Sequence, residues 1–522
     1  MAAAPHALAS QSALAVLREG GNAVEAMIAA AATIAVVYPH MNSIGGDSFW
    51  LVHAPGQSPR AIDACGAAAH LASRDWYGAQ SITQAIPFRG GVAANTVAGT
   101  LSGWQMAFEH AQSLGGRMPL SRLLEDAVWY ARQGVPVTRS QHLNTASKRA
   151  ALESQPGFAQ VFLPQGRVPE IGERFVQPAL AATLERIAQA GIADFYQGDL
   201  ARSMALELEA AGSPLRLDDL GSHRAQMRDP LVLEHSRGRV FNFPPPTQGL
   251  VSLIILAILD RLGIERLDPL GADYVHCAVE ATKLAFGIRD RHITDPRHMD
   301  VEAQSLLAPA LLDQLAARVD PGHAAGWGQG KGPADTIWMG VIDGEGRAVS
   351  FIQSIYHEFG SGVVLPSSGV TWQNRGCSFS LDAAARNALL PGRKPFHTLN
   401  PAMALLADGR TMVYGNMGGD GQPQTQSAVF TRTVVFGMDP QRAISAPRWL
   451  LGRTWGQATD SLKLESRFAP DVVAELRRRG HEVEVLNDFD ETVGHAQAVL
   501  RDAQGNFEGG ADPRSDGSVA AF

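Results

Sequence analysis

Apolar residues recur along the chain at two spacings, which separate helical segments from extended ones. They lie three or four residues apart in Leu120–Gln133, 177–190, 200–211, 250–262 and 274–290, which predicts amphipathic or buried helices. The runs TIWMGVID and RAVSFIQS are rich in β-formers and flank Gly344-Glu345-Gly346, the pattern of a β-hairpin. Helices and strands alternate over most of the remainder, so the pattern predicts an α/β fold.

The first 53 residues predict a pair of helices that leads into a sheet. Ser10 is expected to cap the first helix, which ends at Gly20-Gly21, and Asn22 with Glu25 forms a capping pair for the second. The apolar run 26–38 is Ala-rich and too short to cross about 30 Å of hydrocarbon. We therefore expect a buried helix there, followed by a strand at 48–53.

Composition and charge narrow the class of protein. The 522 residues are 45% apolar and 18% charged, which excludes a disordered or fibrous chain. The net charge is −8, with 44 Lys and Arg against 52 Asp and Glu, which argues against a nucleic-acid or membrane partner. The three cysteines are widely spaced, which argues against disulfides and a thiolate zinc site. No signal segment is visible, so we expect a cytoplasmic protein. No other metal or organic cofactor is implied. We expect a small-molecule substrate.

One junction stands out for its chemistry. A glycine-rich linker at 320–335 meets the first strand of the hairpin at Asp335-Thr336. If the chain were cut there, Thr336 would carry both a hydroxyl and a free α-amine, whose usual pKa is about 7.7–8.0. That combination is a nucleophile with its own general base. On this dipeptide alone, an ordinary strand start is the more frequent explanation.

Several motifs, taken in their order along the chain, favour cleavage at this junction over an ordinary strand start. DTIWMGVIDGEGRAVSFIQS, PGRKPFHTLNPAMALLADG, GNMGGDGQPQTQ and GGADPRSDG resemble the small chain of the gamma-glutamyltransferase family of N-terminal-nucleophile hydrolases. GGNAVEAMIAAA, IGGDSFWLV, GVAANTVAGTLSGW and PPPTQGLVSL resemble its large chain. The resemblance implies a four-layer αββα sandwich made as a precursor. This precursor would cleave itself between Asp335 and Thr336 into chains 1–335 and 336–522, which pair in one domain.

The resemblance also implies roles for individual residues. Thr336 would be the nucleophile of both self-cleavage and catalysis, and Ser354 on the facing strand would assist its hydroxyl. Gly418 and Gly419 would form the oxyanion hole through their backbone N–H groups. Without this context, the two glycines would be read as a turn.

The sequence departs from the family where the substrate's amino-acid group should bind. Cys65 stands where the family has an arginine that holds the substrate carboxylate. The family's Asn, Gln and Asp around the donor correspond to Tyr356, Arg375 and Ser378 here. Its paired serines correspond to His397 and Thr398. A site for a zwitterion has thus become one suited to an anion, with Arg375 as a bidentate carboxylate ligand and His397 nearby. Alternatively, Arg375 is a salt-bridged structural residue, His397 a hydrogen-bonded strand-end residue, and Cys65 a packing residue.

These departures favour a threonine-nucleophile amidohydrolase that acts on a small anionic amide such as oxamate. The first alternative is a gamma-glutamyltransferase or glutathione hydrolase with a rebuilt carboxylate clamp. The second, from another class, is an uncleaved binding protein. A homodimer of the two-chain unit is compatible with either enzyme.

Overall fold

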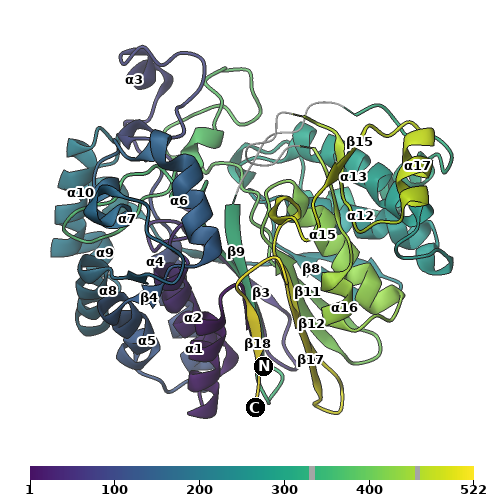
Figure 1. The fold of residues 1–522 in the computed structure, drawn as a ribbon, viewed down its shortest axis with the longest axis horizontal. Coiled ribbons are helices and arrows are strands. Elements are labelled where there is room, and N and C mark those ends of the chain that lie inside the picture. The colour runs from purple at the N-terminus through teal and green to yellow at the C-terminus, as the bar shows by residue number, and fades with distance from the viewer. Residues whose placement is uncertain (328–334, 453–458) are drawn as a thin grey trace.

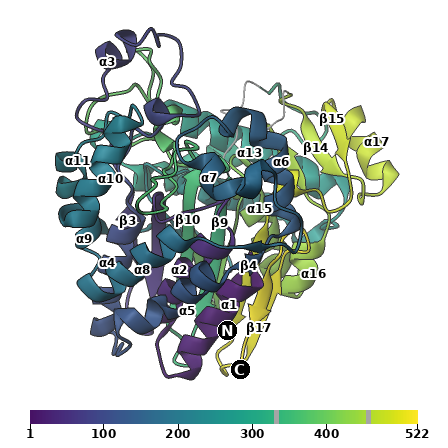
Figure 2. The same ribbon diagram turned by 60° about the vertical axis from the view of Figure 1, so that its left-hand side comes forward.

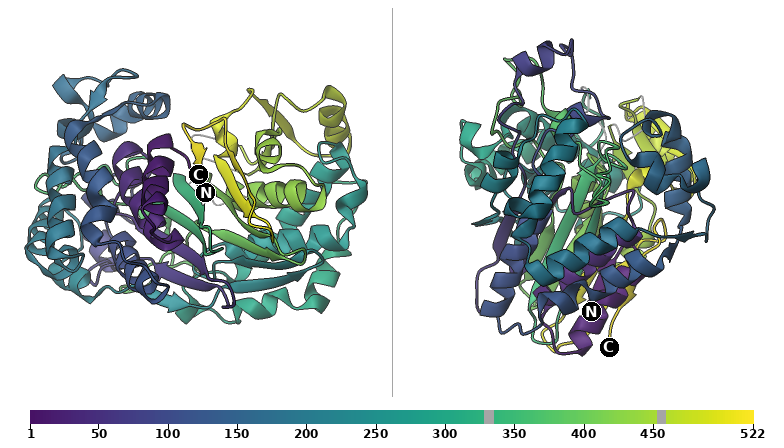
Figure 3. Two further views of the ribbon diagram at one scale, coloured as in Figure 1. Left: turned by 90° about the horizontal axis from the view of Figure 1, so that it is seen from below. Right: turned by 90° about the vertical axis from the view of Figure 1, so that its left-hand side faces the viewer.

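The computed structural model describes residues 1–327, 335–452 and 459–522. Its main body is a four-layer sandwich in which two β-sheets pack face to face and helices cover both outer sides (Figure 1; Figure 3, left). This confirms the predicted αββα fold. The central part of the predicted linker, residues 328–334, lies outside the described residues.

The first sheet has seven strands and contains the start of the predicted small chain at its centre. Its order is β18 (Ser518–Ala520), β1 (Ala2–Ala4), β9 (Asp335–Ile342), β10 (Ala348–Tyr356), β2 (Asp47–His53), β3 (Arg60–Ala64) and β6 (Gln226–Arg228). The antiparallel pair β9–β10 is the predicted hairpin. Because β1 pairs with both β18 and β9, the two ends of the chain lie side by side (Figure 1).

The second sheet has six antiparallel strands. Its order is β17 (Phe507–Ala511), β16 (Ala496–Arg501), β12 (Thr411–Asn416), β11 (Ala402–Leu406), β8 (Gly238–Asn242) and β7 (Leu231–His235). Two small sheets lie at the periphery: β13 (Trp449–Leu451) with β14 (Leu462–Glu465) and β15 (Val483–Leu486), and β4 (Val135–Pro136) with β5 (Arg174–Phe175).

Helices of the predicted large chain cover the first sheet (Figure 2). They are α1 (Ala7–Arg18), α2 (Ala23–Val37), α4 (Thr100–Ser113), α5 (Leu120–Gln133) and α8 (Pro178–Ala190), with α3 (Arg74–Gly78), α6 (Arg139–Leu152), α7 (Phe158–Phe162), α9 (Asp194–Gln197), α10 (Asp199–Ala210) and α11 (Leu217–Ser222) around them. Every residue of α2 is buried, as its apolar run predicts. No helix within the described ranges has the length and apolar character needed to span a membrane.

The second sheet is covered by helices from both predicted chains. They are α12 (Gly249–Arg261), α13 (Ala272–His292), α14 (Pro309–Ala316), α15 (Gly421–Phe430), α16 (Pro440–Ser445) and α17 (Pro470–Arg478). Residues such as Phe49, Phe243, Trp338 and Met403 form the core between the two sheets. A Cβ at Gly415 would collide with the Trp338 indole, so glycine lets β12 pass close over β9.

The beginning of the first helix differs from its prediction. Helix α1 starts at Ala7, and the side chain of His6 caps it by accepting the N–H of Leu8 at 3.2 Å. Ser10 therefore lies inside the helix, where its hydroxyl donates to the carbonyl of Ser518 at 2.7 Å. The capping pair of Asn22 and Glu25 on α2 is confirmed.

Candidate active site

Thr336 is the second residue of β9 and is 1% exposed. In the pairing with β10, Ile337 lies opposite Gln353 and Asp335 lies opposite Tyr356. Two residues of β10, Ser354 and the next one, therefore face the single residue Thr336, which is the arrangement of a β-bulge. The structure thus places Ser354 on the facing strand beside Thr336, where the resemblance locates it.

The bulge fixes the backbone around Tyr356. Its N–H donates to the Ser354 hydroxyl oxygen at 2.8 Å, and its φ is +81°, a region that side-chain-bearing residues rarely adopt. Strained backbone of this kind is typical of functional sites, where the surrounding structure must hold it in place. Tyr356 is the last residue of β10 and still pairs with Asp335 of β9.

Gly418 and Gly419 lie between the end of β12 and the start of α15. Their φ values are +124° and +51°, so both need the conformational freedom of glycine. Neither amide N–H donates to an acceptor within the described part of the chain. Their carbonyls are held in place, by the N–H of Gly421 at 2.7 Å and by Nε2 of Gln248 at 2.8 Å. Two adjacent N–H groups on a fixed turn can stabilise an oxyanion.

A cavity of about 440 Å³ brings together three of the residues predicted to bind substrate, namely Tyr356, Ser378 and Thr398. Phe88 and Phe396 add apolar walls. The Ser378 hydroxyl donates to the Phe396 carbonyl at 3.4 Å, whereas the Thr398 Oγ1 is buried without a hydrogen-bond partner among the described residues. The size and mixed polarity suit a small polar substrate.

Arg375 stacks on Tyr356 and is not itself among the residues that line the cavity. Its guanidinium carbon is 3.9 Å from the centre of the Tyr356 ring, and the residue is 1% exposed. Nη1 and Nη2 are both buried without hydrogen-bond partners among the described residues. Burial lowers the pKa of the guanidinium from its usual value. A buried cation whose donors are unused is costly unless a ligand pairs with it.

Cys65 and His397 meet in the protein interior beside a carboxylate. Nε2 of His397 lies 3.0 Å from the Cys65 Sγ and 3.4 Å from Oδ2 of Asp47. Burial raises the pKa of the Cys65 thiol well above its usual value, so this cysteine is protonated and unreactive. Burial also holds the pKa of His397 far below 6.5, so the imidazole is neutral. Of these residues, only Arg375 offers a cation to an anionic substrate.

A model of the gamma-glutamyltranspeptidase family matches residues 9–522. The chain belongs to this family. It is 58% identical to the oxamate amidohydrolase proenzyme of Klebsiella pneumoniae and 41% identical to the glutathione hydrolase-like YwrD proenzyme of Bacillus subtilis. Each alignment covers 100% of this chain and 98% of the relative. The crystal structure of a cephalosporin acylase from Bacillus halodurans superposes with a TM-score of 0.90 at 33% identity, covering 100% of this chain and 95% of that one.

These comparisons confirm the resemblance drawn from the sequence, the N-terminal-nucleophile fold and the prediction of an enzyme of this family. The roles of the individual site residues stay predictions. For a gamma-glutamyltranspeptidase family member, the Cys65–His397 contact is informative because Cys65 is the residue predicted to correspond to the family's arginine.

Two residues of this gamma-glutamyltranspeptidase site received no role from the sequence. Asp47 accepts the N–H groups of Gly66 and Gly99 at 2.9 and 3.1 Å, besides its contact with His397. Gln248 links the Gly418-Gly419 turn to the segment that contains Thr398, because its Nε2 donates to the carbonyls of Gly419 and Thr398. Asp47 lies in IGGDSFWLV and Gln248 in PPPTQGLVSL, two motifs that resemble the family's large chain. Their position in these motifs is the sequence signal that could have marked them as site residues.

Proposed function

We propose that the chain is a self-processing amidohydrolase whose nucleophile is Thr336 and whose substrate is a small anionic amide such as oxamate. The observation that carries the substrate class is the buried guanidinium of Arg375, whose Nη groups both lack hydrogen-bond partners among the described residues. A carboxylate joined directly to an amide could pair with that fork while the amide stays close to Thr336. The 58% identical relative named as an oxamate amidohydrolase supports the same choice.

The geometry suggests how the precursor would mature. The Thr336 hydroxyl attacks the carbonyl of Asp335, and the peptide becomes an ester as the amide nitrogen leaves the carbonyl. This shift moves the hydroxyl proton to the nitrogen and so frees the Thr336 α-amine. Water then hydrolyses the ester, which regenerates the Thr336 hydroxyl and leaves a carboxyl at residue 335. The bulge that places Ser354 beside Thr336 gives the hydroxyl a neighbouring hydrogen-bonding group.

The same groups then serve the catalytic cycle. The Thr336 α-amine takes the proton of its own hydroxyl as the oxygen attacks the substrate amide. The N–H groups of Gly418 and Gly419 stabilise the resulting oxyanion. Ammonia leaves with a proton from the α-ammonium, and water hydrolyses the acyl-enzyme to release the dicarboxylate. Arg375 would hold the substrate carboxylate throughout.

Glutathione hydrolysis is the alternative, because the 41% identical relative carries that name. The γ-glutamyl group of glutathione carries an α-ammonium, which Arg375 would repel. Its α-carboxylate would lie near Cys65, which offers no positive charge to bind it. We therefore expect a kcat/KM for oxamate well above that for glutathione.

The test is steady-state hydrolysis of oxamate, by ammonia release, and of glutathione, by glutamate release. Arg375→Gln should lower kcat/KM for oxamate by about 10- to 100-fold, the loss of one charge-assisted contact. Arg375→Lys keeps the charge without the planar fork and should fall between the two. Efficient glutathione hydrolysis by the wild type, with oxamate ignored, would favour the alternative.

A further inference from the structure

Arg289 is a buried arginine that contacts the residue next to the proposed oxyanion hole. It lies on α13, and its side chain is 0% exposed. Its Nη1 donates to Oδ1 of Asp420 at 2.8 Å and to Oε1 of Gln248 at 3.3 Å. Asp420 directly follows Gly419 in the chain. A residue of the predicted large chain thus reaches the turn of the predicted small chain.

The guanidinium of Arg289 is held by further contacts. Its Nε donates to Oδ1 of Asp290 at 2.8 Å, and its central carbon lies 3.9 Å from the centre of the Phe286 ring. Burial alone would lower the pKa of Arg289, but Asp420 and Asp290 raise it above its usual value, so the side chain is charged. A charged fork fixed in this way can hold the groups that it contacts in one arrangement.

The contact with Arg289 determines which way the Gln248 amide points. A guanidinium only donates hydrogen bonds, so the amide oxygen must face Nη1 and the amide nitrogen must face the other way. Nε2 there donates to the carbonyls of Gly419 and Thr398 at 2.8 and 3.0 Å. Arg289 therefore holds Asp420 directly and Gly419 through Gln248. Two successive residues of the turn depend on one arginine.

We propose that Arg289 is a positioning residue of the candidate active site, which fixes the Gly418-Gly419 turn through Asp420 and Gln248. This proposal rests on the proposed function, in which the N–H groups of both glycines stabilise the oxyanion. Such donors are effective because they already point at the oxygen before the reaction begins. A misplacement of about 1 Å can cost about 100-fold in rate. Loss of Arg289 should therefore lower kcat and leave KM nearly unchanged.

Kinetics on oxamate, or on whichever small amide the wild type hydrolyses, test this role. Arg289→Met removes every donor and keeps an apolar stem. We expect kcat, counted per molecule cleaved before Thr336, to fall by about 30- to 100-fold, with KM within about threefold of the wild type. Arg289→Lys keeps the charge and should recover part of the loss. Asp420→Asn keeps the shape of the partner and should lower kcat by about tenfold, which provides the same test if Arg289→Met does not mature.

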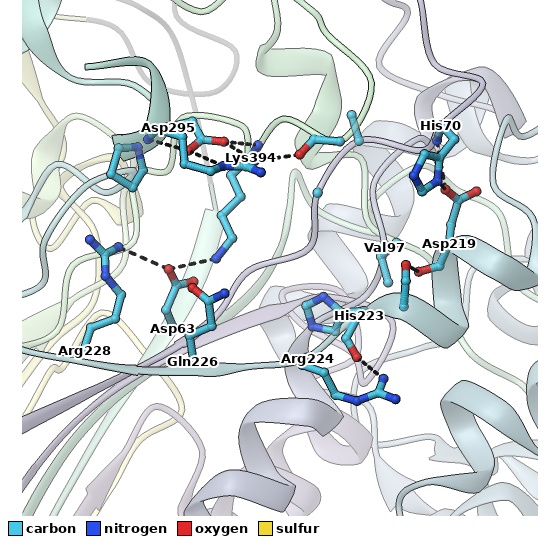
Figure 4. Close-up of a pocket in the computed structure, with 16 residues that line it drawn as sticks. Asp63, His70, Val97, Asp219, His223, Arg224, Gln226, Arg228, Asp295 and Lys394 are labelled. Carbon is cyan, nitrogen blue, oxygen red and sulfur yellow. Dashed lines mark hydrogen bonds and ion pairs between the residues drawn. The ribbon is translucent and has the colours of Figure 1, made fainter. Parts of the chain in front are cut away.

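Arg228 provides the matched control (Figure 4). Its Nη1 also donates to a buried carboxylate, Asp63, at 3.3 Å, in a cavity of about 500 Å³. This cavity shares no lining residue with the one around Tyr356, and Asp63 also pairs with Lys394 Nζ at 2.9 Å. Arg228→Met should therefore leave kcat within about threefold of the wild type. A loss as large as that in Arg289→Met would show a general effect of removing such arginines and would contradict the proposal.

A double-mutant cycle with Gly418→Ala separates positioning from a general structural role. If Arg289 acts through the turn, its loss costs little once Gly418→Ala has disturbed the N–H groups, so kcat of the double variant should lie within about threefold of Gly418→Ala. Independent effects multiply, and so does a smaller folded fraction. Multiplied losses, or an unchanged kcat in both Arg289→Met and Asp420→Asn, would overturn the proposal and leave the oxyanion hole in place. An unchanged kcat in Gly418→Ala itself would instead remove the hole, and this proposal with it.

Discussion

The guanidinium of Arg375 and the ring of Tyr356 are stacked, with 3.9 Å between the guanidinium carbon and the ring centre. Tyr356 lines the cavity together with Thr398 and Ser378, so the guanidinium stacks on a residue of the cavity wall. A cation over an aromatic face is stabilised by about 0.5–2 kcal/mol, more when it is desolvated. Tyr356 thus helps to keep in the interior a charged group whose Nη atoms have no hydrogen-bond partner within residues 1–327, 335–452 and 459–522.

The stacking predicts that the ring of Tyr356 matters more than its hydroxyl. Tyr356→Phe should keep kcat/KM for oxamate within about threefold, because the ring face is retained. Tyr356→Ala should lower it by tenfold or more, because water then reaches Arg375. Ammonia-release kinetics on both variants check this. A large loss in Tyr356→Phe would show that the hydroxyl takes part in the reaction.

The Cys65–His397 contact predicts what a change of substrate class requires. Arg375→Gln with Cys65→Arg restores two family residues, but an arginine at 65 would collide with His397, whose Nε2 is 3.0 Å from the Cys65 Sγ. Adding His397→Ser makes room. The kcat/KM of the triple variant for glutathione should exceed that of the wild type by about ten- to a hundredfold if the carboxylate clamp is restored.

The double variant without His397→Ser is the control and should gain less. Oxamate hydrolysis should fall in both. An equal gain on glutathione in the double and triple variants would show that His397 does not obstruct the clamp.

The proposed role of Gly418 and Gly419 in the oxyanion hole predicts that substitutions there lower kcat more than they change KM. Gly418→Ala forces a side chain into φ +124° and places its Cβ 3.3 Å from the Gly494 Cα. We expect kcat to fall by about 10²–10³ with a smaller change in KM, because the N–H groups act in the transition state. Unchanged kcat in both Gly418→Ala and Gly419→Ala would remove these residues from the mechanism.

Asp47 predicts a pH dependence of stability. Burial raises its pKa from 3.8 to about 6, so the folded state binds a proton more tightly than the unfolded state does. The resulting stabilisation is complete below pH 3.8 and is lost as the pH rises through about 6. The isosteric Asp47→Asn variant lacks this titration. The stability of the wild type relative to Asp47→Asn should fall between pH 4 and 7, by up to about 3 kcal/mol. Urea unfolding of both proteins at several pH values checks the sign.

Local sequence predicted those parts of the fold that local interactions determine. The capping pair of Asn22 and Glu25, the helix Leu120–Gln133 and the β9–β10 hairpin all arise within short segments. Strand β1, Ala2–Ala4, was not predicted because it exists only through pairing with β9 and β18, more than 300 residues away. His6 was missed as a cap for a related reason, since histidine is an uncommon N-cap residue.

The candidate site divides in the same way. Order of motifs was enough to place Thr336, Ser354, Gly418 and Gly419 on their strands and turns. The stacking of Arg375 on Tyr356, and the contacts of Asp47 and Gln248, depend on segments that approach one another only in the folded chain. No spacing within the sequence encodes those contacts.

The central claim is that Thr336 is a nucleophile released by self-cleavage, and intact mass spectrometry of the purified protein tests it most directly. The wild type should give two chains, residues 1–335 and 336–522, whereas Thr336→Ala should give one chain of 522 residues without activity. Thr336→Ser keeps a hydroxyl and should still be cleaved. Cleavage of Thr336→Ala at the same bond, or a wild type that stays whole and active, would contradict the account.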